Sequence, residues 1–85
     1  MKIAGFPRLA ADPAICGGRP IVDGTRMRVS DILEMLAQGV GEPEILADFS
    51  YIQASDIRAC LAFAANAADH PIVVAASKVA YGGVR

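Results

Sequence analysis

The sequence predicts an α+β fold, mostly helical, in which an N-terminal β-hairpin packs on three helices. Two local patterns support this prediction: an Asp-Gly pair between two β-prone segments, and three stretches with apolar residues at helical spacing, joined by short turns. The composition agrees with it. At 85 residues and 54% hydrophobic residues, the chain has room for one small domain and is too apolar for a disordered tail.

The hairpin is predicted around Asp23-Gly24, which joins Pro20-Ile21-Val22 to Thr25–Val29. An Asp-Gly pair between β-prone segments is typical of a tight hairpin turn. In the second arm Arg26 and Arg28 alternate with other residues, so we expect both to lie on one face of the strand.

The helices are predicted by apolar residues that recur every three or four positions. Their predicted bounds are Asp31–Gln38, Glu42 to near Phe49, and about Ala54 to Asp69. Ser30 is the expected N-cap of the first helix and Gly39 its end, Gly41 is the expected N-cap of the second, and His70-Pro71 ends the third.

We expect residues 1–70 to form a single domain of hairpin and helices, with residues 71–85 as a tail outside it. Within the tail, Ile72-Val73-Val74 is predicted as a strand or a buried extended segment, and Ala75–Tyr81 as a short helix. The tail is a candidate contact with a second copy or with a partner.

The charge is unevenly distributed along the chain. The net charge is −1, which argues weakly against binding nucleic acid by bulk electrostatics. Residues 1–30 nevertheless sum to +3, residues 31–70 sum to −6, and Lys78 and Arg85 in the tail add +2. The sequence therefore predicts two opposed surfaces, one basic and one acidic.

Targeting and cysteine patterns indicate a soluble cytoplasmic protein. The N-terminus lacks the apolar run of a secretory signal, and no apolar run approaches the length of a membrane span. Cys16 and Cys60 are far apart and form no CxxC pair, so we expect two small buried thiols without a disulfide or zinc site.

The segment Ala37-Gln38-Gly39-Val40-Gly41 fits the turn of a helix-turn-helix, with a small residue before the glycine and an apolar residue after it. A longer series of motifs is more specific. It comprises Asp12-Pro13-Ala14-Ile15-Cys16-Gly17-Gly18-Arg19-Pro20, Ile21–Val29, Ile32-Leu33, Leu36–Gly39, Glu44-Ile45-Leu46, Asp56-Ile57 and Ala59-Cys60-Leu61. This series resembles the small domain-of-unknown-function family catalogued as number four hundred and thirty-three, over about residues 8–69.

The resemblance implies a homeodomain-like helix-turn-helix core and the role of an antitoxin, often paired with a PIN-like toxin ribonuclease. The sequence departs from the family pattern at two positions. Gln53 stands where the family usually has a Ser or Thr N-cap, and Ser50 stands where proline is common. Both departures leave the start of the third helix less well defined.

DNA binding is the first functional hypothesis. It requires cations or amides that reach phosphates and base edges. The short second helix carries three carboxylates and no cation, so the hairpin face and the third helix are better candidates. The candidate DNA-binding residues are Arg19, Arg26, Arg28, Ser55 and Arg58. The alternative is that these arginines form a solvated face paired with Asp23, Asp31 or Glu34.

Protein binding is the second hypothesis, with or without DNA binding. An acidic middle and an apolar tail fit a basic or apolar partner, such as a toxin or a second copy of the chain. The candidate partner-binding residues are Glu42, Glu44, Asp48, Ile72, Val73 and Val74. The alternative is that these residues complete the chain's own core and surface. A homo-oligomer is expected from the small size and from the symmetry of operators.

Catalysis is the weakest hypothesis. His70 stands alone beside Pro71, and no second histidine, metal-ligand cluster or phosphate loop accompanies it. We therefore expect no enzymatic activity, no metal and no cofactor.

Overall fold

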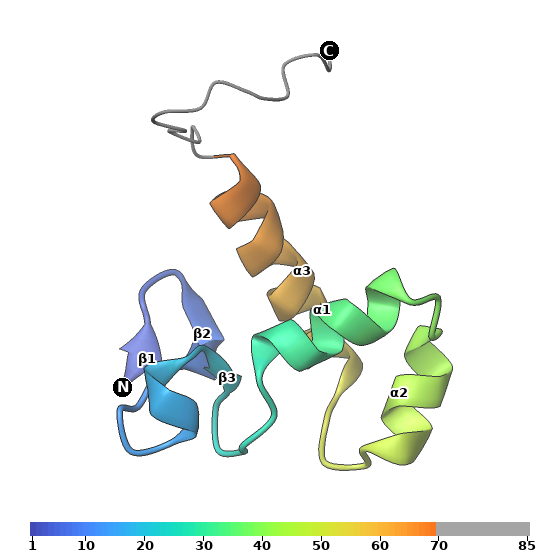
Figure 1. Cartoon of the computed structure of the whole chain (residues 1–85), viewed down its shortest axis with the longest axis horizontal. Coiled ribbons are helices and arrows are strands. Elements are labelled where there is room, and N and C mark those ends of the chain that lie inside the picture. The colour runs from blue at the N-terminus through green and yellow to red at the C-terminus, as the bar shows by residue number, and fades with distance from the viewer. Residues whose placement is uncertain (70–85) are drawn as a thin grey trace.

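The computed structural model describes residues 1–69 and has the expected α+β architecture (Figure 1). Three short strands form an antiparallel sheet at the N-terminal end, and three helices follow it. In chain order the elements are β1 (Lys2–Ile3), β2 (Phe6–Ala10), the 3-10 turn η1 (Cys16–Gly18), β3 (Ile21–Val22), α1 (Val29–Ala37), α2 (Glu42–Asp48) and α3 (Ala54–Ala68). The predictions for residues 70–85 lie outside the described part of the chain.

The sheet has the order β1-β2-β3, so β2 is its central strand. Leu9 pairs with Val22 and Ala10 with Ile21, and all four side chains are buried. The sequence did not reveal β2 as a strand, because Pro7 and Arg8 stand in its middle and both are exposed.

The predicted turn at Asp23-Gly24 is present, but the predicted second arm, Thr25–Val29, is not a strand. Gly24 adopts a φ of +81°, and the backbone N–H of Thr25 donates to the Val22 carbonyl at 3.0 Å. Beyond the turn, pairing is limited to an isolated bridge between Ile21 and Arg28. The arm is short because Val29 is buried and already begins α1. The ladder partner of β3 is therefore β2.

Two of the helices begin and end close to their predicted bounds, whereas α1 starts early. Helix α1 begins at Val29, so Arg28 and not Ser30 occupies the N-cap position. The N–H of Val29 donates to the carbonyl of Pro20 at 2.9 Å, which fixes the chain to the sheet at this point. Gly39, with a φ of +92°, ends the helix in the left-handed region that glycine adopts without strain.

The core lies between the sheet and the three helices. Its buried members are Leu9, Val22, Met27, Val29, Ile32, Ile45, Ile52, Ile57 and Cys60. Phe6 of β2 also packs edge-to-face on Phe63 of α3, with ring centroids 5.3 Å apart. Phe6 and Leu9 of β2 are thus part of the apolar core that joins the sheet to the helices.

Asp56 joins the sheet to α3 by polar contacts. Its side chain is only 7% exposed, and its Oδ1 accepts a hydrogen bond from Nη1 of Arg8 at 3.0 Å. Its Oδ2 accepts from the backbone N–H of Gln53 at 2.9 Å, as the third residue of a capping box does. Asp56 therefore defines the start of α3, and no Ser or Thr is needed at position 53.

The second half of α3 extends beyond the core (Figure 1). Leu61 is 48% exposed, and residues 65–69 are all exposed. Across residues 1–69, no helix has the length and apolar character needed to cross a membrane.

Replacing Asp56 by alanine should lower the free energy of unfolding by about 2–3 kcal/mol, since Arg8 and the Gln53 N–H both lose their acceptor. Urea denaturation measures this loss. The control is Lys2→Ala, which removes the exposed pair between Lys2 Nζ and Asp23 Oδ2 and should cost less than about 1 kcal/mol. Equal losses in the two variants would contradict the role assigned to Asp56.

Candidate interaction surfaces

Arg19 and Arg26 lie on neighbouring loops at the sheet end of the domain. Arg19 follows η1, and Arg26 lies in the turn between β3 and α1. The Cys16 thiol of η1 contacts the backbone carbonyl of Arg26 at 3.6 Å, which holds the two loops together. Both arginines are exposed, and within residues 1–69 neither has an ion-pair partner. We refer to these two exposed arginines together as the Arg19/Arg26 surface.

Arg28 is engaged by its own helix. Its Nε donates to Asp31 Oδ2 at 3.1 Å and its Nη2 to Asp31 Oδ1 at 2.9 Å. This hydrogen bonding and the charge of Asp31 raise the pKa of Arg28 above its usual value. Arg28 therefore matches the alternative to DNA binding, in which the arginine is paired with a carboxylate such as Asp31.

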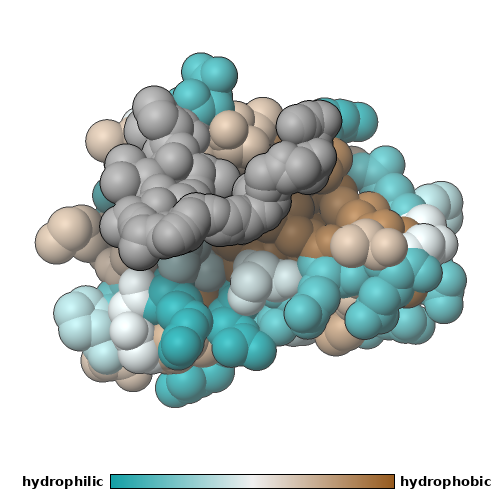
Figure 2. Space-filling model, turned by 45° about the horizontal axis from the view of Figure 1, so that its top comes forward, coloured by the Kyte–Doolittle hydropathy of each residue, from teal (hydrophilic) through white to brown (hydrophobic). Residues whose placement is uncertain are grey.

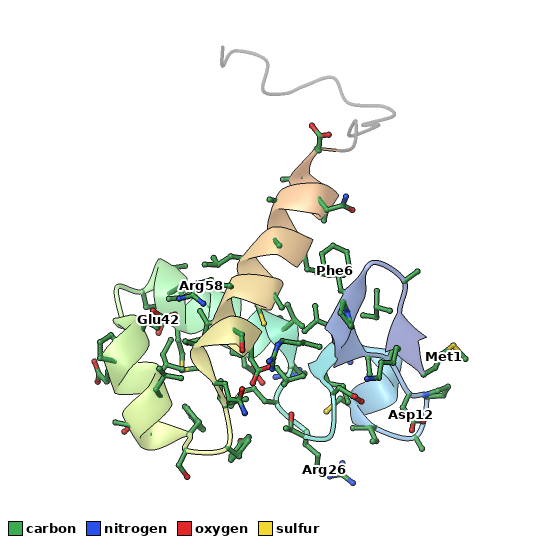
Figure 3. The ribbon with its side chains drawn as sticks, turned by 180° about the vertical axis from the view of Figure 1, so that it is seen from behind. Met1, Phe6, Asp12, Arg26, Glu42 and Arg58 are labelled. Atoms are coloured by element: carbon green, nitrogen blue, oxygen red, sulfur yellow. The ribbon has the colours of Figure 1, made fainter. Side chains whose placement is uncertain are left out.

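Arg58 and Ser55 are not part of the Arg19/Arg26 surface. Arg58 is exposed on α3 and lies on the side of the molecule that carries Glu42, well away from Arg26 (Figure 3). Ser55 is half-buried in the first turn of α3. The five candidate DNA-binding residues therefore do not form one continuous site.

Helix α2 lies at the opposite end of the domain from the sheet (Figure 1) and carries three carboxylates. Glu44 and Asp48 are exposed and Glu42 is half-buried, while Ile45 points into the core. In the described part of the chain, none of the three carboxylates has an ion-pair partner. We call these three residues the α2 acidic surface. The other candidate partner residues, Ile72, Val73 and Val74, lie outside the described residues.

Two hollows were not anticipated from the sequence. One, of about 260 Å³, is lined by Lys2, Pro7, Arg8, Asp23 and Asp56, and it contains the two ion pairs of the sheet. The capping-box spacing of Gln53 and Asp56 is a sequence signal for the start of α3, but not for the ion pair between Asp56 and Arg8. The other, of about 340 Å³, is an apolar groove lined by Arg19, Pro20, Val29, Ser30, Leu33 and Phe63. These residues come from segments far apart in the sequence, so no local pattern predicts that groove.

The two cysteines differ in their surroundings. Cys60 is fully buried, and burial raises the pKa of its thiol to about 11, with a smaller contribution from the Asp56 carboxylate. Cys16 is half-buried, and both thiols are free. Among residues 1–69, no group of three His, Cys, Asp or Glu side chains is arranged to hold a metal ion.

Comparison with known proteins links the chain to a family. The family model described as "Protein of unknown function (DUF433)" matches residues 10–64. A crystal structure of a DUF433 member protein from Anabaena variabilis superposes with a TM-score of 0.67 at 25% sequence identity. That match covers 69% of this chain and 58% of the other, so this chain spans little more than half the length of that protein. No curated protein matches the chain.

Iodoacetamide at pH 8 should modify Cys16 and leave Cys60 intact in the folded protein. A pKa of about 11 for Cys60 leaves roughly one thiolate in a thousand at that pH, and the buried sulfur is also inaccessible. Mass spectrometry should show one adduct in buffer and two in urea. Equal labelling of the two cysteines in buffer would contradict this account.

The raised pKa of Cys60 also predicts a pH dependence of folding. Because the thiol has a higher pKa in the folded protein than in the unfolded chain, the free energy of unfolding should be constant below about pH 9 and fall as the pH rises toward 11.

Proposed function

The chain belongs to the DUF433 family, and from this membership and its divided surface charge we propose that it is an antitoxin that binds a basic partner protein through the α2 acidic surface. The partner expected for such a protein is a toxin, of which a PIN-like ribonuclease is the candidate class. A regulatory role at DNA is the second candidate.

The observation that supports protein binding is the free charge of α2. Its three carboxylates form no ion pair within residues 1–69, and α2 itself carries no Lys or Arg. Unpaired carboxylates repel the negatively charged phosphates of DNA and attract a positively charged protein surface. In a helix-turn-helix reading, α2 follows the turn at Gly39 and would approach the duplex, where its charge is unfavourable. A basic protein surface fits the same helix well.

Coexpression with the product of the adjacent reading frame tests this proposal. The wild-type chain should copurify with that product, and the Glu44→Lys, Asp48→Lys double variant should bind it at least about tenfold more weakly. Isothermal titration calorimetry gives the affinities. The matched control is Glu34→Lys, which reverses an exposed carboxylate on α1 and should leave the affinity unchanged. No complex with the wild-type chain, or equal weakening in both variants, would argue against binding through α2.

DNA binding is favoured by a different observation, the two unpaired arginines of the Arg19/Arg26 surface. Exposed arginines on adjacent loops can contact phosphates without a recognition helix. Two cations supply a small electrostatic contribution, so this surface would position the protein on DNA more than specify a sequence.

Titrating a fluorescent duplex of the chain's own upstream DNA against salt tests this second role. Two phosphate contacts predict a slope of about −2 in log K against log salt. The Arg19→Glu, Arg26→Glu variant should abolish binding. As a control, Lys2→Glu changes a cation already paired with Asp23 and should have a smaller effect. Binding that does not weaken as salt rises would exclude a phosphate-contacting surface.

A further inference from the structure

The outward face of α3 has no partner in the described domain. The buried side of this helix consists of Asp56, Ile57 and Cys60. On the opposite side Arg58, Leu61, Ala62, Ala65 and Asp69 are all exposed, Leu61 at 48%. We call these five residues the outer face of α3. A space-filling view shows hydrophobic residues gathered over α3 and α1, with hydrophilic residues around them (Figure 2).

The outer face of α3 has opposite charges at its two ends. Arg58 and Asp69 are 11 positions apart, which is about three helical turns, so both side chains lie on the same side of the helix. Every residue between them is uncharged. Within residues 1–69, neither Arg58 nor Asp69 has an ion-pair partner.

This charge pattern is complementary to itself when one copy is reversed. We propose that the outer face of α3 binds the same face of a second copy, with the two helices antiparallel about a two-fold axis. Arg58 of each copy then lies opposite Asp69 of the other copy, once at each end of the contact. A parallel arrangement would place like charges together, so the pattern selects the antiparallel one.

The residues between the charges fit such a contact. Ala62 and Ala65 lie nearest the two-fold axis, where small side chains allow two helices to approach to about 8 Å. Leu61 of each copy lies at the edge of the contact, where its exposed side chain becomes partly buried against the other copy. Phosphates would gain little from these uncharged positions, which makes a nucleic acid a poor occupant. Because few residues take part, the contact is smaller than a standard interface, and a dissociation constant of about micromolar is expected.

The oligomeric state of the full chain tests the proposal. Sedimentation equilibrium of the wild type should give a mass near twice 8.9 kDa at tens of micromolar. Arg58→Asp and Asp69→Arg should each weaken dimerisation at least about tenfold, because each creates two like-charge contacts. The double variant R58D/D69R restores opposite charges at both ends and should return the dissociation constant to within about threefold of wild type.

A matched control and circular dichroism separate this interface from other effects. Arg26→Asp makes the same charge change on an exposed arginine away from α3 and should leave the dissociation constant unchanged. Unaltered helix content in each variant shows that the fold is intact. The proposal is overturned by a wild-type monomer at all concentrations, by a dimer that persists in both single variants, or by a double variant that stays monomeric.

Discussion

The structure depends on the buried carboxylate of Asp56. One oxygen accepts from the backbone at the start of α3 and the other from Arg8 of the central strand, so one side chain fixes both the first turn of the helix and its position against the sheet. Leu9, Ile57 and Cys60 then close the apolar core around that junction. Because a buried carboxylate must be satisfied, the sheet and helix are held in one arrangement, and the direction in which α3 leaves the core follows from it.

This arrangement also decides which charges remain available for binding. Three cations of the N-terminal segment form ion pairs: Arg8 with Asp56, Arg28 with Asp31, and Lys2 with Asp23. The basic N-terminal segment therefore keeps few free cations, although its formal charge suggested a strong basic surface. The acidic helix α2, in contrast, retains its charges. The near-zero net charge of the chain therefore does not show this difference between a partly neutralised basic segment and an acidic helix α2 whose carboxylates form no ion pair within residues 1–69.

The sequence predicted local features well and long-range ones poorly. The end of α1 at Gly39 and the apolar spacing within α2 and α3 are local sequence signals, so the end of α1 and the bounds of α2 and α3 agree closely with prediction. Strand β2 was missed because its alternation is interrupted at Pro7 and Arg8. The pair between Arg8 and Asp56 spans 48 positions, and no local rule identifies a partner at that distance. The division of the arginines between two faces likewise follows from the tertiary arrangement.

The extension of α3 beyond the core has a consequence for local stability. The first half of this helix is held by buried side chains and by Asp56, so we expect its hydrogen-bonded amide protons to exchange slowly with solvent. The last turns are exposed, and an exposed helix end opens more readily than the core. The same helix therefore contains two segments of different stability, and any molecule that covers its outer face slows exchange in the second segment selectively.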